Sequence, residues 1–150
     1  PDKALEEIAR VLKPGGVVGL REEDMDSWLM APHDPVLERF IQLYVRFWQE
    51  EKSGDPFLGR HHRRLLREAG FTRVAATATT ESRGDAEGTR QWGEFMARAG
   101  LEPIFADRVV DLGWVDRKEL ESMAAAARAW GEHPDAFFAV ICCEAVGWTR

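Results

Sequence analysis

The chain has 150 residues, of which 45% are hydrophobic and 31% are charged, and its formal net charge is −6. This length suits one domain with its own core, and no apolar run approaches the roughly 20 residues of a membrane-spanning helix, so no membrane partner is expected. The negative charge argues against a nucleic-acid partner, because phosphate binding needs clustered positive charge. No export-signal pattern is visible, and the adjacent Cys142 and Cys143 are poorly placed to bridge each other. These features predict a cytoplasmic protein.

The stretch from Ala4 to Glu22 predicts a helix, a tight turn and a strand. Pro14 and Gly15 suit the second and third positions of a turn, because proline presets φ and glycine accepts a positive φ. The apolar run over residues 17–20 then predicts a strand that is buried on both faces of a parallel sheet. One apolar helix face is formed by Leu5, Ile8, Ala9 and Leu12, which recur at helical spacing.

An acidic loop over residues 21–28 follows this strand. Ligands of open α/β sheets bind outside the carboxyl ends of the strands, so this loop is the best-placed one in the chain for chemistry. Glu22 and Asp24 are its candidate catalytic carboxylates. A solvated loop without a chemical role is the alternative.

The next helix is predicted to begin at Asp34 and Pro35, as its N-cap and first position. It presents a wide apolar arc, which predicts a cap over a pocket for an apolar or aromatic substrate, a core helix, or an interface. The segment Lys52-Ser53-Gly54-Asp55-Pro56 is expected to end this helix and begin a loop. The arc consists of Val36, Leu37, Phe40, Ile41, Leu43, Tyr44, Phe47 and Trp48.

A further helix is predicted over Gly59–Ala69, with Gly70 as its left-handed C-cap. Its arginines form a mostly solvated face, but Arg60 lies near the helix start and could orient an anionic or carbonyl substrate. His61 and His62 point about 100° apart on a helix, so they cannot chelate one metal ion as an i, i+4 pair could. No metal site is predicted.

Residues 72–82 predict a second strand, joined to the first by a parallel crossover. Helices then follow, with Asp85 as the N-cap of one and Asp116 as the N-cap of another, where Glu119 completes a capping box. Residues 136–146 are almost wholly apolar. This run predicts a final strand in the middle of a sheet.

The run EIARVLKPGG followed by an apolar strand resembles the segment of class I S-adenosylmethionine-dependent methyltransferases that carries the fourth helix and fifth strand, particularly in the ubiquinone and menaquinone C-methyltransferase-like group. LLREAGFTRV resembles the fifth helix, glycine stop and sixth strand of that family. The resemblance implies an α/β fold with the last three strands of a Rossmann-like sheet, the final one antiparallel between the other two. It makes residues 1–150 one domain, the C-terminal half of that fold, with a helical cap insertion around 34–58 and helical segments around 85–131.

The resemblance also implies the substrate-binding C-terminal portion of a methyltransferase that acts on a small apolar or aromatic molecule. S-adenosylmethionine would be the cofactor of the complete enzyme. The chain alone is expected to be inactive, because the half with the glycine-rich turn is missing. The candidate catalytic residues are Glu22, Asp24 and His61, and the candidate substrate-binding residues are Trp28, Phe40, Tyr44, Arg60 and Trp92.

Two alternatives stay open. A non-enzymatic α+β module would use its aromatic helices to bind a ligand or a protein partner. A nucleic-acid binder using the arginines of residues 60–67 would show a steep salt dependence. In addition, a partial sheet would expose an apolar edge, which predicts pairing with another chain, as a homo-oligomer or with a missing N-terminal half.

Overall fold

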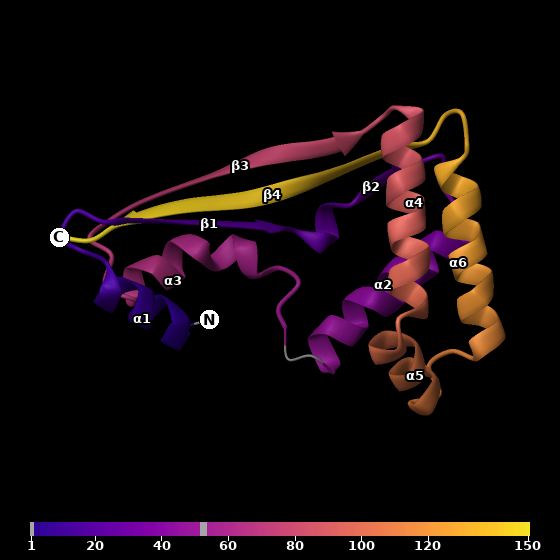
Figure 1. Ribbon diagram of the computed structural model, residues 1–150, viewed down its shortest axis with the longest axis horizontal. Coiled ribbons are helices and arrows are strands. Elements are labelled where there is room, and N and C mark those ends of the chain that lie inside the picture. The colour runs from indigo at the N-terminus through magenta and orange to yellow at the C-terminus, as the bar shows by residue number, and fades with distance from the viewer. Residues whose placement is uncertain (1, 52–53) are drawn as a thin grey trace. The chain divides into compact units, whose positions relative to one another are not determined.

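The computed structural model describes residues 2–51 and 54–150 (Figure 1). Of the helix exit predicted over residues 52–56, Lys52 and Ser53 lie outside the described residues. The chain divides into two compact units. Unit 1 comprises Pro1–Trp28, Pro56–Glu81 and Val140–Arg150, and unit 2 comprises Leu29–Asp55 and Ser82–Ala139. The elements are α1 (Asp2–Val11), β1 (Val17–Glu23), η1 (Met25–Ser27), β2 (Leu29–Ala31), α2 (Pro35–Glu50), η2 (Leu58–His61), α3 (His62–Glu68), β3 (Arg73–Arg83), α4 (Ala86–Leu101), α5 (Pro103–Asp111), α6 (Arg117–Gly131) and β4 (Phe137–Trp148), where η marks a 3-10 helix.

Strand β4 is the middle strand of the sheet in unit 1. It pairs antiparallel with β1, from Val17 opposite Trp148 to Glu23 opposite Cys142. Strand β3 also pairs with β4, on the side away from β1, and runs in the opposite direction to β4 (Figure 1). The last strand therefore lies between the other two, which agrees with the sequence-based expectation, and the fold is a mixed α/β one.

Helices α1 and α3 pack on one face of this sheet. The side chains of Leu5, Leu65, Leu66, Phe71 and Ala145 form one buried cluster, and Val18 and Leu20 of β1 pack against it. Burying a leucine side chain is worth about 1.5 to 3 kcal/mol relative to leaving it in water. This cluster therefore holds the two helices of unit 1 on the sheet.

The other face of β1 is exposed within unit 1. Val17 is 51% exposed, and the more buried residues of β1 alternate with exposed ones. The prediction of a strand buried on both faces is therefore wrong for the described chain, because α1 and α3 both pack on the side of Val18 and Leu20. The exposed face instead carries polar pairs: Arg21 donates to Glu144 at 2.9 Å and to Glu81 at 2.6 Å.

Unit 2 is mainly helical, with the short strand β2 paired antiparallel to the first residues of β4. Its helices α4 and α6 lie in backbone contact, because a Cβ atom on Gly93 would come within 2.5 Å of the Ala127 carbonyl oxygen and 3.0 Å of the Gly131 Cα. The small residues of α6 thus permit this close approach. The core side chains of this unit include Leu37, Phe40, Phe47, Met96, Phe105, Val109, Leu120, Met123 and Trp130.

The predicted helix caps are present. The carboxylate of Asp34 accepts from the backbone N–H of Val36 at 2.8 Å, and Asp85 and Asp116 cap α4 and α6 in the same way. The backbone N–H of Glu119 donates to the Asp116 carboxylate, which is one of the two hydrogen bonds of the capping box. The side chain of Glu119 instead accepts from Arg39 at 2.6 Å. These caps fix where the helices begin, because they satisfy N–H groups that have no partner inside the helix.

Within residues 2–51 and 54–150, no helix has the length and apolar character needed to cross a membrane. The same residues contain no group of three or more His, Cys, Asp or Glu side chains placed to hold a metal ion. Cys142 is buried and Cys143 is partly buried, and neither is in a disulfide. Burial raises the pKa of both thiols, so they stay protonated at neutral pH.

Candidate functional site

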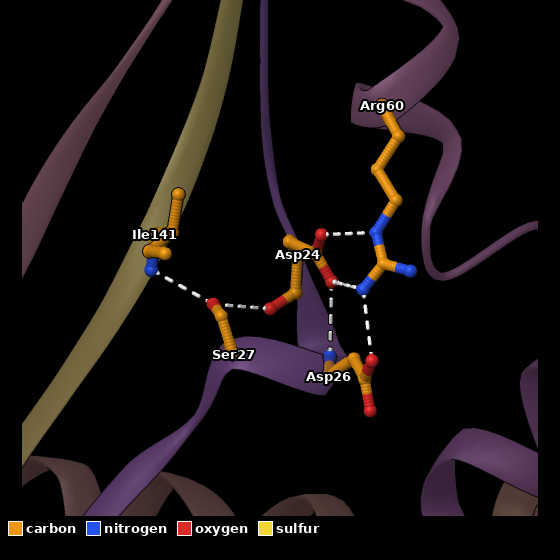
Figure 2. Close-up of polar contacts among 5 residues, drawn as sticks. All are labelled: Asp24, Asp26, Ser27, Arg60 and Ile141. Atoms are coloured by element: carbon orange, nitrogen blue, oxygen red, sulfur yellow. Dashed lines mark hydrogen bonds and ion pairs between the residues drawn. The ribbon is translucent and has the colours of Figure 1, made fainter.

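Arg60 organises the acidic loop that follows β1 (Figure 2). Its Nε donates to Asp24 Oδ2 at 2.5 Å, and its Nη2 donates to Asp24 Oδ1 at 2.8 Å. The same Nη2 also donates to Asp26 Oδ2 at 2.9 Å. The planar guanidinium fits a carboxylate with two parallel hydrogen bonds, which gives this pair a defined geometry. The structure thus brings together two predicted site residues, Asp24 and Arg60.

Hydrogen bonds of the backbone also hold Asp24 in place. Asp24 comes directly after β1, and its N–H donates to the carbonyl oxygen of Ile141 at 2.9 Å. Its carboxylate accepts from the backbone N–H of Asp26 at 3.1 Å and so caps η1. The hydroxyl of Ser27 donates to the Asp24 carbonyl and accepts from the Ile141 N–H, at 2.7 and 2.8 Å (Figure 2). The loop is therefore bonded to β4 through both Asp24 and Ser27.

Gly59 allows η2, which carries Arg60, to lie directly against the sheet. A Cβ atom at this position would come within 2.6 Å of the Cys143 Cβ and 3.4 Å of the Glu22 carbonyl oxygen. Any residue other than glycine would push η2 away from β1 and β4. Glycine at position 59 therefore places the guanidinium of the next residue at the end of β1.

Charge pairing sets the chemistry of this cluster. The hydrogen bonds from Arg60 hold the pKa of Asp24 below its usual value, although burial opposes the shift. Asp24 is therefore a weak base, better suited to hold the guanidinium than to accept a proton. The Nη1 group of Arg60 has no hydrogen-bond partner among the described residues, and it points away from both carboxylates (Figure 2). It is placed to bind an acceptor atom of a ligand, since the side chain is 45% exposed.

His62 is a further candidate that the sequence-based prediction did not include. Its side chain is buried, its Nε2 lies 3.5 Å from Glu22 Oε2, and its Nδ1 has no partner in the described part of the chain. A buried polar group without a partner costs about 1 to 3 kcal/mol, so such an imidazole is a candidate for contact with a ligand. Helical spacing could have revealed it, because His62 lies one turn before the buried Leu65 and Leu66.

The other predicted residues of unit 1 lie around this cluster. Glu22 is on the helix-covered face of β1 and 48% of its side chain is exposed. His61 is exposed, and the burial of His62 shows that the two neighbouring imidazoles diverge, as expected. Trp28 is the C-cap residue of η1 and is partly buried.

Of the three predicted substrate-binding residues in unit 2, two are buried in the core and one lines a groove. Phe40 and Trp92 are buried in the core: Phe40 makes an edge contact with Phe105 at 6.0 Å between centroids, and Trp92 stacks on Phe138 at 4.5 Å. Tyr44 instead lines a groove of about 510 Å³. The groove is lined by Tyr44, Phe47, Trp48, Phe95, Arg98, Ala99, Glu102, Ile104 and Phe105.

The chain is similar to a known protein. No protein-family model matches the chain. The chain is 29% identical over 163 aligned residues to the probable methyltransferase ltbC of Aspergillus luteorubrus, and the match covers 99% of the chain and 53% of that protein. The chain thus spans about half the length of the curated relative it matches. The similarity supports a methyltransferase family, and the mixed α/β fold is compatible with it.

The described residues of unit 1 do not fit a binding site for S-adenosylmethionine. Asp24 at the end of β1 is buried and accepts two hydrogen bonds from Arg60, so its carboxylate is committed to the guanidinium rather than to the ribose hydroxyls of such a cofactor. The tandem glycines Gly15 and Gly16 lie in the turn before β1, whereas open α/β sheets bind ligands beyond the carboxyl ends of their strands. We therefore assign no residue of this chain to the cofactor.

Proposed function

We propose that the chain is the substrate-binding C-terminal portion of an S-adenosylmethionine-dependent methyltransferase that acts on a small apolar or aromatic molecule. The observation that carries the proposal is the similarity to a probable methyltransferase along 99% of the chain. The run EIARVLKPGG favours the ubiquinone and menaquinone C-methyltransferase-like group within that class. The position of the Asp24 and Arg60 cluster at the carboxyl end of β1 supports a ligand site there.

In this proposal, the chain contributes mainly by orienting the acceptor. Holding a reactant in the right geometry can supply about 7 to 11 kcal/mol of a reaction barrier. Arg60 Nη1 would donate to an oxygen of the acceptor, while Asp24 and Asp26 hold the guanidinium in place. Glu22 and the neighbouring His62 are placed to take a proton from an acceptor that must lose one, and the exposed His61 is the other candidate base.

We also infer that activity requires a second segment of protein, because the described residues do not form the cofactor site. Strand β1 is the end strand of its sheet, so its outer edge suits pairing with another strand. The partner would be a missing N-terminal half or a second copy of the chain. Light scattering tests this point: a uniform monomer at micromolar concentration would contradict self-association.

The proposed function is tested with the complete protein that contains this chain and with the chain alone. Calorimetric titration of the chain with S-adenosylhomocysteine should show no binding, and micromolar binding would overturn the assignment of the cofactor site to another segment. In the complete protein, Arg60→Ala should lower methyl transfer to an aromatic acceptor by about tenfold or more, as expected when a positioning contact is lost. Arg63→Ala is the matched control, because Arg63 is an exposed arginine of α3. Equal activity of the two variants would contradict the assigned site.

The second candidate function is a non-enzymatic binding module. The groove in unit 2 favours it, because its lining residues all belong to that unit. Such a module would bind an aromatic ligand, and the complete protein would transfer no methyl group.

A further inference from the structure

Strand β3 leaves one edge of the unit 1 sheet unpaired. It pairs with β4 on one side, and none of the described strands pairs with it on the other side (Figure 1). Residues 75–80 are all exposed, and the run over residues 74–80 contains no charge, proline or glycine. Natural sheets commonly protect a long edge with a charge, a proline or a bulge. An edge without these features suits the addition of another strand.

The side chains of β3 alternate regularly between the two faces of the sheet. Arg73 lies over the Trp148 ring, 3.9 Å from its centroid, and Thr79 donates to Glu144 at 2.8 Å. Glu81 belongs to the polar pairs on the same exposed face of the sheet. Since alternate residues of a strand point to opposite faces, the odd-numbered residues of β3 all lie on this face. No bulge therefore interrupts the strand between Arg73 and Glu81.

The hydrogen bonds of β4 determine which backbone groups of β3 point to the open edge. The carbonyl oxygen of Ile141 accepts from the N–H of Asp24, just beyond β1, so the odd-numbered residues of β4 form hydrogen bonds on the β1 side. The even-numbered residues of β4 form theirs with the odd-numbered residues of β3, which share their face. The even-numbered residues of β3 thus direct their N–H and C=O groups to the open edge.

An antiparallel second copy of β3 fits this edge in a charge-complementary register. Even-numbered residues must pair with even-numbered residues, because only these present backbone groups at the edge. With Thr77 opposite Thr77 of the second copy, Arg73 of each copy lies opposite Glu81 of the other. A shift of two residues would place Arg73 opposite Arg83 or, in the other direction, opposite Thr79. The register centred on Thr77 therefore pairs opposite charges at both ends of the contact.

Both charged side chains have capacity left for this contact. The guanidinium of Arg73 stacks on Trp148 and has no carboxylate partner in the described part of the chain. A stacked guanidinium can still donate hydrogen bonds in its own plane. Glu81 accepts from Arg21 through Oε1, and its Oε2 has no hydrogen-bond partner among the described residues. The Cβ atoms of directly opposite residues lie about 4.5 to 5.5 Å apart, which is within reach of both side chains.

We propose that the protein forms a symmetric dimer in which the β3 edges of two copies pair antiparallel, with Thr77 at the two-fold axis. The two sheets then join into one, and the pairing closes at two copies because it uses the same edge of each. The outer edge of β1 stays available for another segment. This inference goes beyond the proposed function and is independent of it, since pairing needs neither a methyl donor nor an acceptor.

Oxidative cross-linking tests the register. Thr77 directs its backbone groups to β4, so across the open edge it forms a pair without hydrogen bonds, whose Cα atoms lie about 4.5 Å apart, within disulfide range. Thr77→Cys should therefore give a covalent dimer on a non-reducing gel. Ala75→Cys is the matched control, because its two copies would lie about 13 Å apart along the strands. No covalent dimer of Thr77→Cys, or equal linking of both variants, would overturn the proposal.

The unsubstituted chain controls for the native thiols. Cys142 is buried and Cys143 is partly buried, so this chain should give no covalent dimer under the same conditions. Sedimentation equilibrium should nevertheless show that it is a dimer at micromolar concentration. A monomer would overturn the proposal and leave the β3 edge to a strand of another protein.

Charge reversal tests the contacts at the two ends. Arg73→Glu and Glu81→Arg each place like charges opposite each other twice, so each variant alone should have a dimer dissociation constant about tenfold higher or more at low ionic strength. An equal mixture of the two should restore the dimer, because every contact between them pairs a glutamate with an arginine. Arg63→Glu, at an exposed arginine of α3, is the matched control and should leave the dimer intact.

The mixture makes the charge test specific for β3. A dimer that neither variant weakens would use another surface, such as the edge of β1, and would overturn the proposal. Two weakened variants that do not restore each other would also contradict the register. An unchanged melting temperature verifies the fold of each variant, and the cross-linking of Thr77→Cys decides the question independently of both.

Discussion

Arg60 and Asp24 meet through two guanidinium nitrogens and two carboxylate oxygens, at 2.5 and 2.8 Å. The Asp24 side chain is 9% exposed and that of Arg60 is 45% exposed. The carboxylate is thus the buried partner, and the arginine links it to the surface of unit 1. Removing either side chain has consequences for the folded state as well as for a ligand.

Asp24→Asn should lower the free energy of unfolding by about 1 to 3 kcal/mol, because it weakens charged hydrogen bonds at a buried position. Asp26→Asn is the matched control: Asp26 accepts from the same Arg60, but its side chain is 68% exposed, so a loss below about 1 kcal/mol is expected. Urea unfolding of both variants measures the difference. Equal losses would show that burial does not strengthen the Asp24 contact.

The same pair predicts a pH dependence. Arg60 lowers the pKa of Asp24 in the folded state, so the unfolded state takes up this proton more readily. The stability supplied by Asp24 is therefore fully present above the usual aspartate pKa of about 3.9 and is lost as the pH falls towards the lower folded pKa. The stability difference between the wild type and Asp24→Asn should shrink between about pH 6 and about pH 3. A difference that stays constant in urea unfolding over this range would contradict the assignment.

Gly93→Ala should destabilise unit 2 by about 1 to 3 kcal/mol, because the new methyl group would collide with the backbone of α6. Gly88→Ala is the control in the same helix, where the nearest atom to the new Cβ is the Arg83 Cβ at 3.3 Å. Its effect should be smaller than about 1 kcal/mol, since alanine favours the helix and the crowding is slight. Thermal unfolding of the two variants gives the comparison, and a tolerated Gly93→Ala would mean that the helices can separate at little cost.

His62→Leu should change the free energy of unfolding by less than about 1 kcal/mol, because it replaces an unsatisfied buried imidazole by an apolar group of similar size. If His62 takes a proton from the acceptor, the same variant should lower turnover of the complete protein by about a hundredfold. His61→Leu is the counterpart at the exposed neighbour. If His61→Leu lowers turnover and His62→Leu does not, His61 is the base and the assignment of His62 is wrong.

Local patterns in the sequence predict the helix starts well. Asp34, Asp85 and Asp116 are N-caps in the structure, and Gly70 has the positive φ of a C-cap. Such features depend on a few neighbouring residues. The order of the strands depends on pairing between distant parts of the chain. Even so, the long apolar run of β4 indicates that this strand lies in the middle of the sheet.

The details of the site depend on contacts between distant residues. No spacing rule links Asp24 to Arg60, which meet because Gly59 lets η2 lie on the sheet. The burial of His62 in place of His61 depends on the rotation of α3 against the sheet. Likewise, Tyr44 is expected in a pocket, but the contribution of Phe105 depends on how α5 packs against α2.

The pairing of β1 with β4 also determines the order in which the chain can fold. The hydrogen bond from Arg21 to Glu144 closes a loop of 123 residues, whereas α4, α5 and α6 follow one another directly. During synthesis, β1 leaves the ribosome early and waits for β4, with Val18 and Leu20 lacking their final neighbours, while the helices of unit 2 can already associate. Within this chain, β1 is therefore the strand that waits longest for its hydrogen-bonding partner.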